Sequence, residues 1–220
     1  MTTSGTNRGL MNVLTEFFFK NNSTIFTVAE IAVAIEGSTH RRNGLIKRAI
    51  ANGEILNICR GLYCLAQKYQ KTPVSIFALA ERIYGPSYVS LESALSYHHW
   101  ISEAVYTCTC TCVGKSKEFD TPLGNFSFTK IPQQPFFESV ERLVDDRGTS
   151  FIASPAKALA DYIYVHKPSW NTISDAASSL RIEAEDLNTV TSKELQRLSK
   201  IYNSRKVKQF LSSWDKDLQQ

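Results

Sequence analysis

The 220-residue sequence lacks any apolar run near the roughly 20 residues that a helix needs to cross a bilayer. Its N-terminal residues have no extended apolar core of the kind found in export signals, and the acidic Glu16 interrupts their hydrophobic part. We therefore expect a soluble, cytoplasmic protein that does not bind a membrane. The five cysteines are an odd number, which fits poorly with a closed disulfide framework.

The sequence also lacks the motifs that most often mark an active site. It contains no G-x-S-x-G, no H-E-x-x-H and no glycine-rich phosphate loop. Ser154 stands three residues before Lys157, the spacing of a serine–lysine nucleophile pair, but Ser154 is equally well placed to cap a helix. Asp161 follows Lys157 by four residues, which predicts a weak ion pair on a helix surface. We expect no enzyme activity and no cofactor.

Three cysteines alternate with threonine at Cys108, Cys110 and Cys112, so in a strand their thiols lie on one face, about 6–7 Å apart. One interpretation is a metal site completed by His98 and His99. Zinc-binding cysteines are usually separated by two to four residues, and neighbouring histidines in a helix point about 100° apart. Free cysteine, in contrast, is commonly buried. We therefore favour the interpretation that the three cysteines lie on the buried side of a strand, and we expect no bound metal.

Acidic residues are scarce in the first third of the chain. Residues 1–72 hold nine Lys or Arg and four Glu, a net charge of +5, whereas residues 73–220 hold sixteen bases and seventeen acids, a net charge of −1. All of the excess positive charge in the chain's net +4 therefore lies in the first third, as expected of a region that faces nucleic-acid phosphates.

The spacing of apolar residues predicts three helices in this basic region. The first begins near Leu10. The second starts at Thr27, which forms a capping-box pattern with Glu30, and ends at Gly37. The third runs from Ser38 or Thr39 to about Asn52. Two short helices joined by a tight connection that contains glycine predict a helix-turn-helix.

The third helix is predicted to be amphipathic. Small residues on its outward face allow close approach to a surface, while bases beside them reach phosphates or guanine edges. No acid occurs between Thr39 and Gly53, although a merely solvated face remains the alternative. The predicted buried arc is Leu45, Ile46, Ala49 and Ile50; the outward side holds His40, Gly44, Lys47 and Ala51, flanked by Asn43, Arg41 and Arg48, while Arg42 points toward the apolar side or extends outward from it.

A hairpin follows this helix. Residues 55–59 and 62–65 read as two short strands joined by the pair Arg60-Gly61. A hairpin directly after a recognition helix predicts a winged helix-turn-helix DNA-binding domain over residues 1–72, with Arg60 at the wing tip near a phosphate or the minor groove. The predicted DNA-binding residues are His40, Arg41, Arg42, Asn43, Lys47, Arg48 and Arg60.

Residues 73–220 predict a larger α+β domain. The pattern indicates hairpins over 117–131 and 136–153, an antiparallel sheet with helices on one side, and a helical C-terminal segment. That segment holds a run of basic residues. They form either a solvated face or a second basic surface, for DNA or for an acidic or RNA-bound partner. The bases are Lys193, Arg197, Lys200, Arg205, Lys206 and Lys208.

Several segments of this chain occur in a familiar order. They are "RGLYCL" at the end of the wing, "YGPSYVSLESALSYHHWISEAVYTCTC" at 84–110, "FDTPLGNFSFTKI" at 119–131 and "IASPAKALADYIY" at 152–164. Together they resemble the AbiE-type antitoxin-regulators (AbiEi family) of bacterial type IV toxin–antitoxin systems, some of which abort phage infection. The likeness spans roughly residues 10–165.

The resemblance implies a transcriptional autorepressor that is also an antitoxin. It implies binding of two copies to inverted repeats in promoter DNA by a protein that is a monomer or weak dimer in solution. Its counterpart is a nucleotidyltransferase-like toxin, neutralised without a stable complex. The alternative is a protein-binding inhibitor that captures the toxin directly through residues 73–220.

Overall fold

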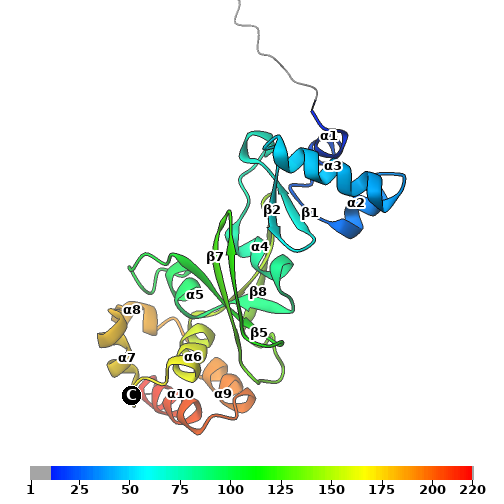
Figure 1. Cartoon of the computed structure of the whole chain (residues 1–220). Helices are drawn as coiled ribbons and strands as arrows, with labels where there is room; N and C mark the ends of the chain where they lie inside the picture. Colours follow the sequence, from blue (N-terminus) through cyan, green and yellow to red (C-terminus); the bar gives the residue numbers. More distant parts are fainter. Residues whose placement is uncertain (1–10, 220) are drawn as a thin grey trace, which may run out of the picture. The chain divides into compact units, whose positions relative to one another are not determined.

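The computed structural model describes residues 11–219, which form a mixed α+β structure. The chain divides into two compact units, the first ending at Val74 and the second beginning at Ser75; the expected boundary, after residue 72, differs by two residues. Each unit has its own sheet (Figure 1).

Unit 1 has three α-helices over its described residues and a three-stranded antiparallel sheet in the order β1-β3-β2. Thr27 forms the predicted capping box with Glu30. Ser38 caps the third helix, because its hydroxyl accepts a hydrogen bond from the amide of Arg41 at 3.2 Å. The elements are α1 (Val13–Lys20), β1 (Ile25–Thr27), α2 (Val28–Ala34), α3 (Thr39–Ala51), β2 (Ile55–Cys59), β3 (Leu62–Leu65) and the short 3₁₀ helix η1 (Gln67–Tyr69).

The core of unit 1 lies between its helices and its sheet. The rings of Phe18 on α1 and Phe26 on β1 stack with their centroids 3.9 Å apart. Ile50 was predicted to be buried, and this is wrong, since the residue is 39% exposed. At 100° per residue Ile50 lies at the edge of the apolar arc of α3. The other three members of that arc are buried as predicted: Leu45, Ile46 and Ala49.

Unit 2 contains a six-stranded sheet in the order β6-β7-β5-β4-β9-β8. Both predicted hairpins form, as β6–β7 and β8–β9. The prediction of an antiparallel sheet is correct only in part. The pairs β4–β5, β6–β7 and β8–β9 are antiparallel, whereas β5 pairs parallel to β7 and β4 pairs parallel to β9. β7 is the second strand of its hairpin and lies beside β5, and β9 is the second strand of the other hairpin and lies beside β4. The strands are β4 (Ser87–Val89), β5 (Thr107–Cys112), β6 (Lys117–Thr121), β7 (Gly124–Lys130), β8 (Val140–Asp145) and β9 (Gly148–Ala153).

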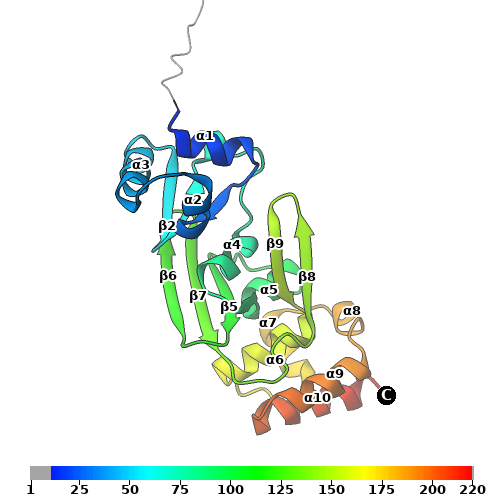
Figure 2. The same cartoon turned by 90° about the vertical axis from the view of Figure 1, so that its right-hand side faces the viewer.

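Helices cover both faces of this sheet, which corrects the expectation of helices on one side. On one face, the amide of Ser93 on α5 donates to the Thr109 hydroxyl of β5 at 3.0 Å. On the other, Tyr84 at the end of α4 packs against Phe128, the strand partner of Cys110. Beyond α6 lie α9 and α10, side by side (Figure 2). The helices are α4 (Ile76–Ile83), α5 (Leu91–Tyr97), α6 (Pro155–His166), α7 (Ile173–Leu180), α8 (Ala184–Leu187), α9 (Ser192–Ile201) and α10 (Arg205–Asp217).

Candidate functional site

The candidate site in unit 1 is the outward face of α3. The helix is held from its other side, where Leu45, Ile46 and Ala49 enter the core. Asn12, the N-cap of α1, also donates from its side chain to the carbonyl of Leu45 at 3.1 Å. Its backbone amide donates to the buried carboxylate of Glu54 at 2.9 Å, just beyond α3. These contacts fix the axis and rotation of α3, and so the direction of its outward face.

Four predicted DNA-binding residues lie exposed on this face: His40, Asn43, Lys47 and Arg48. Within residues 11–219 none of their side chains forms an ion pair. Between them lies Gly44, where an added Cβ would be in ordinary van der Waals contact with the Arg48 guanidinium at 3.7 Å. The face therefore offers free positive charge around a point of close backbone approach.

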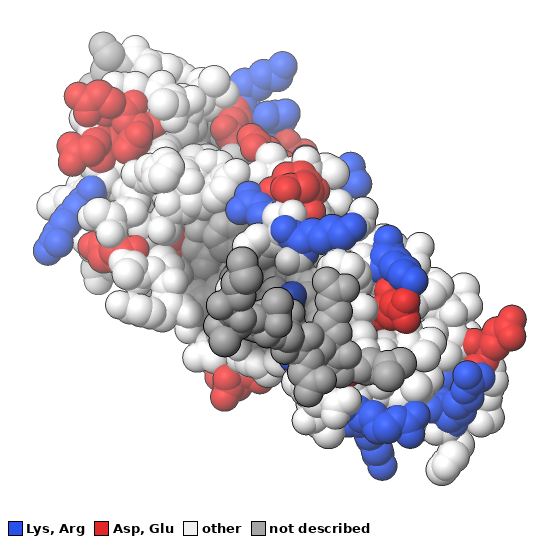
Figure 3. Space-filling model, turned by 90° about the horizontal axis from the view of Figure 1, so that it is seen from above, with Lys and Arg blue, Asp and Glu red and all other residues white. Residues whose placement is uncertain are grey.

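Lys and Arg side chains gather in Figure 3 at the right-hand end of the view, where Figure 1 places the connection between α2 and α3. Acidic side chains lie at the margin of this group. This distribution agrees with the absence of acids along α3 and the presence of Glu30 and Glu36 on and after α2.

Two further predicted residues, Arg41 and Arg42, bind the protein's own backbone. Arg41 donates from Nη1 to the carbonyl of Glu36 at 3.0 Å. Arg42, which is half-buried, donates from Nη1 to the carbonyls of Gly37 at 2.5 Å and Ile35 at 3.5 Å. Both guanidiniums therefore hold the connection between α2 and α3, and Arg42 turns back toward the protein rather than outward.

Arg60 is exposed at the tip of the β2–β3 hairpin. The turn has positive φ only at Gly61, at 82°, as in a type II turn, where glycine favours the second central position. The amide of Val28 at the start of α2 donates to the carbonyl of Gly61 at 3.0 Å, which anchors the tip. Among the described residues, no hydrogen bond joins Arg60 to α3.

The bases predicted as a second surface are partly engaged in unit 2. Arg197 pairs with Glu138, Nε to Oε1, at 3.4 Å. Lys206 donates to the carbonyls of Lys167, at 3.1 Å, and Pro168. Four bases remain exposed, and no ion pair involves them in the part of the chain that the structure describes: Lys193, Lys200, Arg205 and Lys208.

The pair Lys157 and Asp161 was predicted to lie on a helix surface, and this is wrong. Both side chains are fully buried, 3.8 Å apart from Nζ to Oδ1. Asp161 accepts hydrogen bonds from the hydroxyls of Tyr88 at 2.9 Å, Ser90 at 2.7 Å and Thr111 at 3.3 Å. The sequence contains a signal for this burial, since α6 carries alanine or leucine at four of the positions around Lys157, which favours close packing on all sides.

Two more residues complete this buried network. Lys157 donates to the side-chain oxygen of Gln133 and, at 3.1 Å, to the hydroxyl of Tyr202. Burial lowers the pKa of the Lys157 ammonium, and the charge of Asp161 offsets part of that change. Burial also raises the pKa of Tyr202 well above its ordinary value, and Asp161 raises it further. We call Tyr88, Gln133, Lys157, Asp161 and Tyr202 the buried network.

Ser154 is the N-cap of α6, accepting from the Lys157 amide at 3.2 Å. Its hydroxyl donates to Glu194 at 2.5 Å, while the Lys157 ammonium is bonded to Gln133 and Tyr202. The two groups that a serine–lysine nucleophile requires are therefore directed to different partners.

The thiols of Cys108, Cys110 and Cys112 are buried on one side of β5, as predicted. Burial raises the pKa of Cys110 well above its ordinary value, which disfavours the thiolate that binds metals. His98 lies 2.9 Å from the carbonyl of Ala153, measured from Nε2. Over residues 11–219 no group of three or more His, Cys, Asp or Glu has an arrangement that could hold a metal ion.

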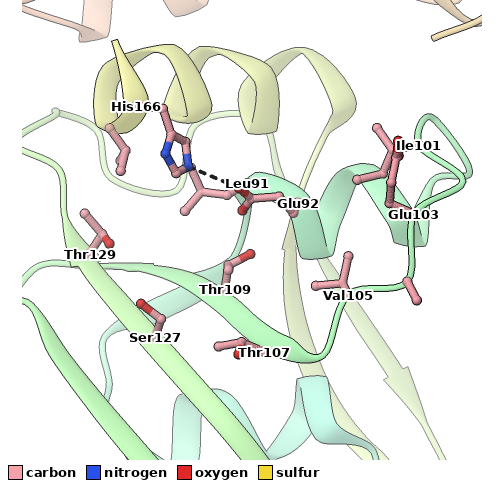
Figure 4. Close-up of a pocket in the computed structure, with 12 residues that line it drawn as sticks. Leu91, Glu92, Ile101, Glu103, Val105, Thr107, Thr109, Ser127, Thr129 and His166 are labelled. Carbon is pink, nitrogen blue, oxygen red and sulfur yellow. Dashed lines mark ion pairs between the residues drawn. The ribbon is translucent and has the colours of Figure 1, made fainter. Parts of the chain in front are cut away.

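Unit 2 also has a hollow of about 430 Å³ between β5, β7 and the ends of α5 and α6. In Figure 4 His166 points from α6 toward Glu92 on α5, with 3.1 Å between His166 Nε2 and Glu92 Oε1. Thr107, Ser127 and Thr129 supply hydroxyls to its wall. Glu92 and a second acid line it without any Lys or Arg, so it is poorly suited to an anion. We call it the acidic hollow.

A scan against protein-family models finds no match for this chain, and a search of curated proteins finds none either. No helix among the described residues is both long and apolar enough to span a bilayer.

Proposed function

We propose that unit 1 is a winged helix-turn-helix module that binds double-stranded DNA with α3 in the major groove. The order of its elements, with the hairpin directly after α3, supports this proposal. The observation that carries it is the free basic face of α3: exposed His40, Asn43, Lys47 and Arg48 around the small residue Gly44. Lysine and arginine supply phosphate contacts, whereas Asn43 and Arg48 have the hydrogen-bonding groups that read base edges.

Arg42 and Arg60 have different roles in this proposal. Arg42 is a positioning residue in this proposal, because its guanidinium holds the carbonyls that end the α2 segment. Arg60 lies on the wing, where it contacts a phosphate or the minor groove. Its anchored turn sets where that contact falls along the DNA.

For the whole chain, we propose a transcriptional autorepressor that is the antitoxin of a type IV toxin–antitoxin pair acting in phage defence. The ordered sequence segments that resemble AbiE-type antitoxin-regulators support this. In this proposal two copies bind the inverted repeats of the promoter, and the counterpart is a nucleotidyltransferase-like toxin that is neutralised without a stable complex. No catalytic role for this chain is part of the proposal.

DNA binding is tested with full-length Lys47→Glu/Arg48→Glu protein and a labelled duplex of its own upstream region, by fluorescence anisotropy. We expect a loss of affinity of about 100-fold or more at moderate salt, because two attractive contacts with phosphates become repulsive. The matched control is Lys193→Glu/Lys208→Glu, which makes the same charge change on exposed helices of unit 2. Unchanged binding by the α3 variant would remove α3 as the DNA-binding element, and an equal loss in the control would show that the effect is not specific to α3.

The antitoxin role is tested separately by co-expression with the product of the adjacent gene. The Lys47→Glu/Arg48→Glu variant is expected to lose repression of its promoter while still rescuing growth, since α3 does not act in neutralisation. Stable co-purification of the two proteins would contradict indirect neutralisation and favour the direct inhibitor.

A further inference from the structure

Unit 2 has a second hollow whose lining is opposite in charge to the acidic hollow. Its volume is about 390 Å³, and its ten lining residues include two lysines and no acid. We call it the lysine pocket. Its lining includes Lys130, Pro132, Gln134, Phe136, Lys200 and Asn203.

The two walls of the lysine pocket come from segments far apart in the sequence. Lys130 ends β7 and is followed by the 131–136 segment, while Lys200 lies in the last turn of α9. An isolated antiparallel bridge between Gln133 and Tyr202 joins these walls. The same two residues bind the Lys157 ammonium with their side chains. The buried network therefore holds the walls together, and the pocket is preformed.

The charge of this pocket favours an anion. Both lysine side chains are exposed, and no ion pair uses either ammonium among the residues that the structure describes. The C-terminal end of α9 opposes an anion by roughly half a unit of negative charge, which two full positive charges outweigh. Arg197 and Glu138 form an ion pair with each other, and neither residue lines the pocket.

The rest of the lining indicates what the anion is attached to. Phe136 is half-buried and contacts the rings of Tyr88 and Phe137, each at 4.9 Å between ring centroids, and it lines the pocket beside Pro132. An aromatic ring of this kind is suited to stacking on a nucleobase. The exposed amides of Gln134 and Asn203 can donate to and accept from the edge of a base. The volume lies at the lower end of the roughly 300–1,000 Å³ typical of small-ligand sites.

We propose that the lysine pocket binds a nucleoside monophosphate, with its phosphate between Lys130 and Lys200 and its base against Phe136. This site is separate from the DNA-binding face proposed for α3. The acidic hollow provides an internal contrast, because two glutamates and no Lys or Arg line it.

The test is isothermal titration calorimetry on the full-length protein with each of the four ribonucleoside monophosphates, inorganic phosphate and adenosine. At least one nucleotide is expected to bind with a Kd below about 1 mM and about tenfold or more tighter than phosphate or adenosine alone, because the two halves add their contacts. Lys130→Gln/Lys200→Gln is expected to weaken nucleotide binding by about tenfold or more. Phe136→Leu is expected to weaken nucleotide binding but not phosphate binding.

The matched control is Lys193→Gln/Lys208→Gln, which removes the same charge outside the pocket and is expected to stay within about twofold of the parent. The Lys47→Glu/Arg48→Glu variant is also expected to bind nucleotide normally, so this proposal and the DNA-binding proposal can fail independently. The proposal is overturned if no nucleotide reaches about 1 mM, if phosphate binds as well as the nucleotides, or if the control loses as much affinity as the pocket variant.

Discussion

The exposed bases of α3 in unit 1 and two bases of unit 2, Lys157 and Arg197, lie in different surroundings. On α3 of unit 1, Lys47 and Arg48 are exposed and form no ion pair within the described part of the chain. In unit 2, Lys157 is buried beside Asp161 and Arg197 is paired with Glu138. A run of positive charge in a sequence therefore says little about binding until the partners of each base are known. Free bases indicate a surface for a polyanion, whereas engaged bases hold the protein together.

The largest expected effect concerns the buried network. Asp161→Asn leaves the buried Lys157 ammonium without its counter-charge, and breaking a buried pair in this way costs about 3–5 kcal/mol. All three tryptophans of the sequence, Trp100, Trp170 and Trp214, lie in unit 2. Urea unfolding followed by tryptophan fluorescence therefore measures the free energy of unfolding of that unit.

The double variant Lys157→Met/Asp161→Asn is the matched control for this prediction. It removes both charges, so we expect it to be more stable than Asp161→Asn alone, because no isolated charge is left in the core. If Asp161→Asn costs under about 1 kcal/mol, or if the double variant is the less stable of the two, the pair does not act as a buried charge pair.

The contrast between the units also explains what the sequence could predict. Helix ends depend on local chemistry, so the caps at Thr27, Ser38 and Ser154 were predictable from neighbouring residues. The spacing of Lys157 and Asp161 is the same on an exposed or a buried helix face, and only the strands and helices packed around α6 decide between them. Periodicity therefore predicted the contact but not its environment.

Strand pairing shows the same limit. Alternation and turn residues predicted both hairpins of unit 2, because hairpin pairing is local. They could not show that β7, rather than β6, lies beside β5, since that choice depends on contacts between distant segments. The parallel pairings and the lysine pocket, which joins Lys130 to Lys200, follow from such contacts and were not predicted.

A smaller effect is expected at Gly44, on the free basic face. Gly44→Ala places a methyl group in ordinary contact with the Arg48 guanidinium, without a clash, and replaces a poor helix former, which is expected to stabilise α3 by about 0.5–1 kcal/mol. Slower hydrogen exchange of the α3 amides would measure this. If DNA approaches α3 here, the same methyl group weakens DNA binding by about 1 kcal/mol or more. Unchanged DNA affinity with the stability gain intact would show that the duplex does not approach at this position.

The smallest effect is expected from Glu138→Gln, which releases Arg197. The pair is partly exposed, at 53% for Arg197 and 25% for Glu138, so its loss is expected to change the free energy of unfolding by no more than about 1 kcal/mol. The change adds one free base to the surface that already holds Lys193 and Lys200. The matched control is Glu141→Gln, which removes an exposed acid from β8.

The decisive measurement for this variant is the salt dependence of DNA affinity. A base that gains a phosphate contact increases the slope of log K against log salt by about one. If only α3 and the wing bind the duplex, Glu138→Gln and Glu141→Gln are expected to keep the parent slope and affinities within about twofold. A steeper slope for Glu138→Gln alone would indicate that the C-terminal helices also contact DNA.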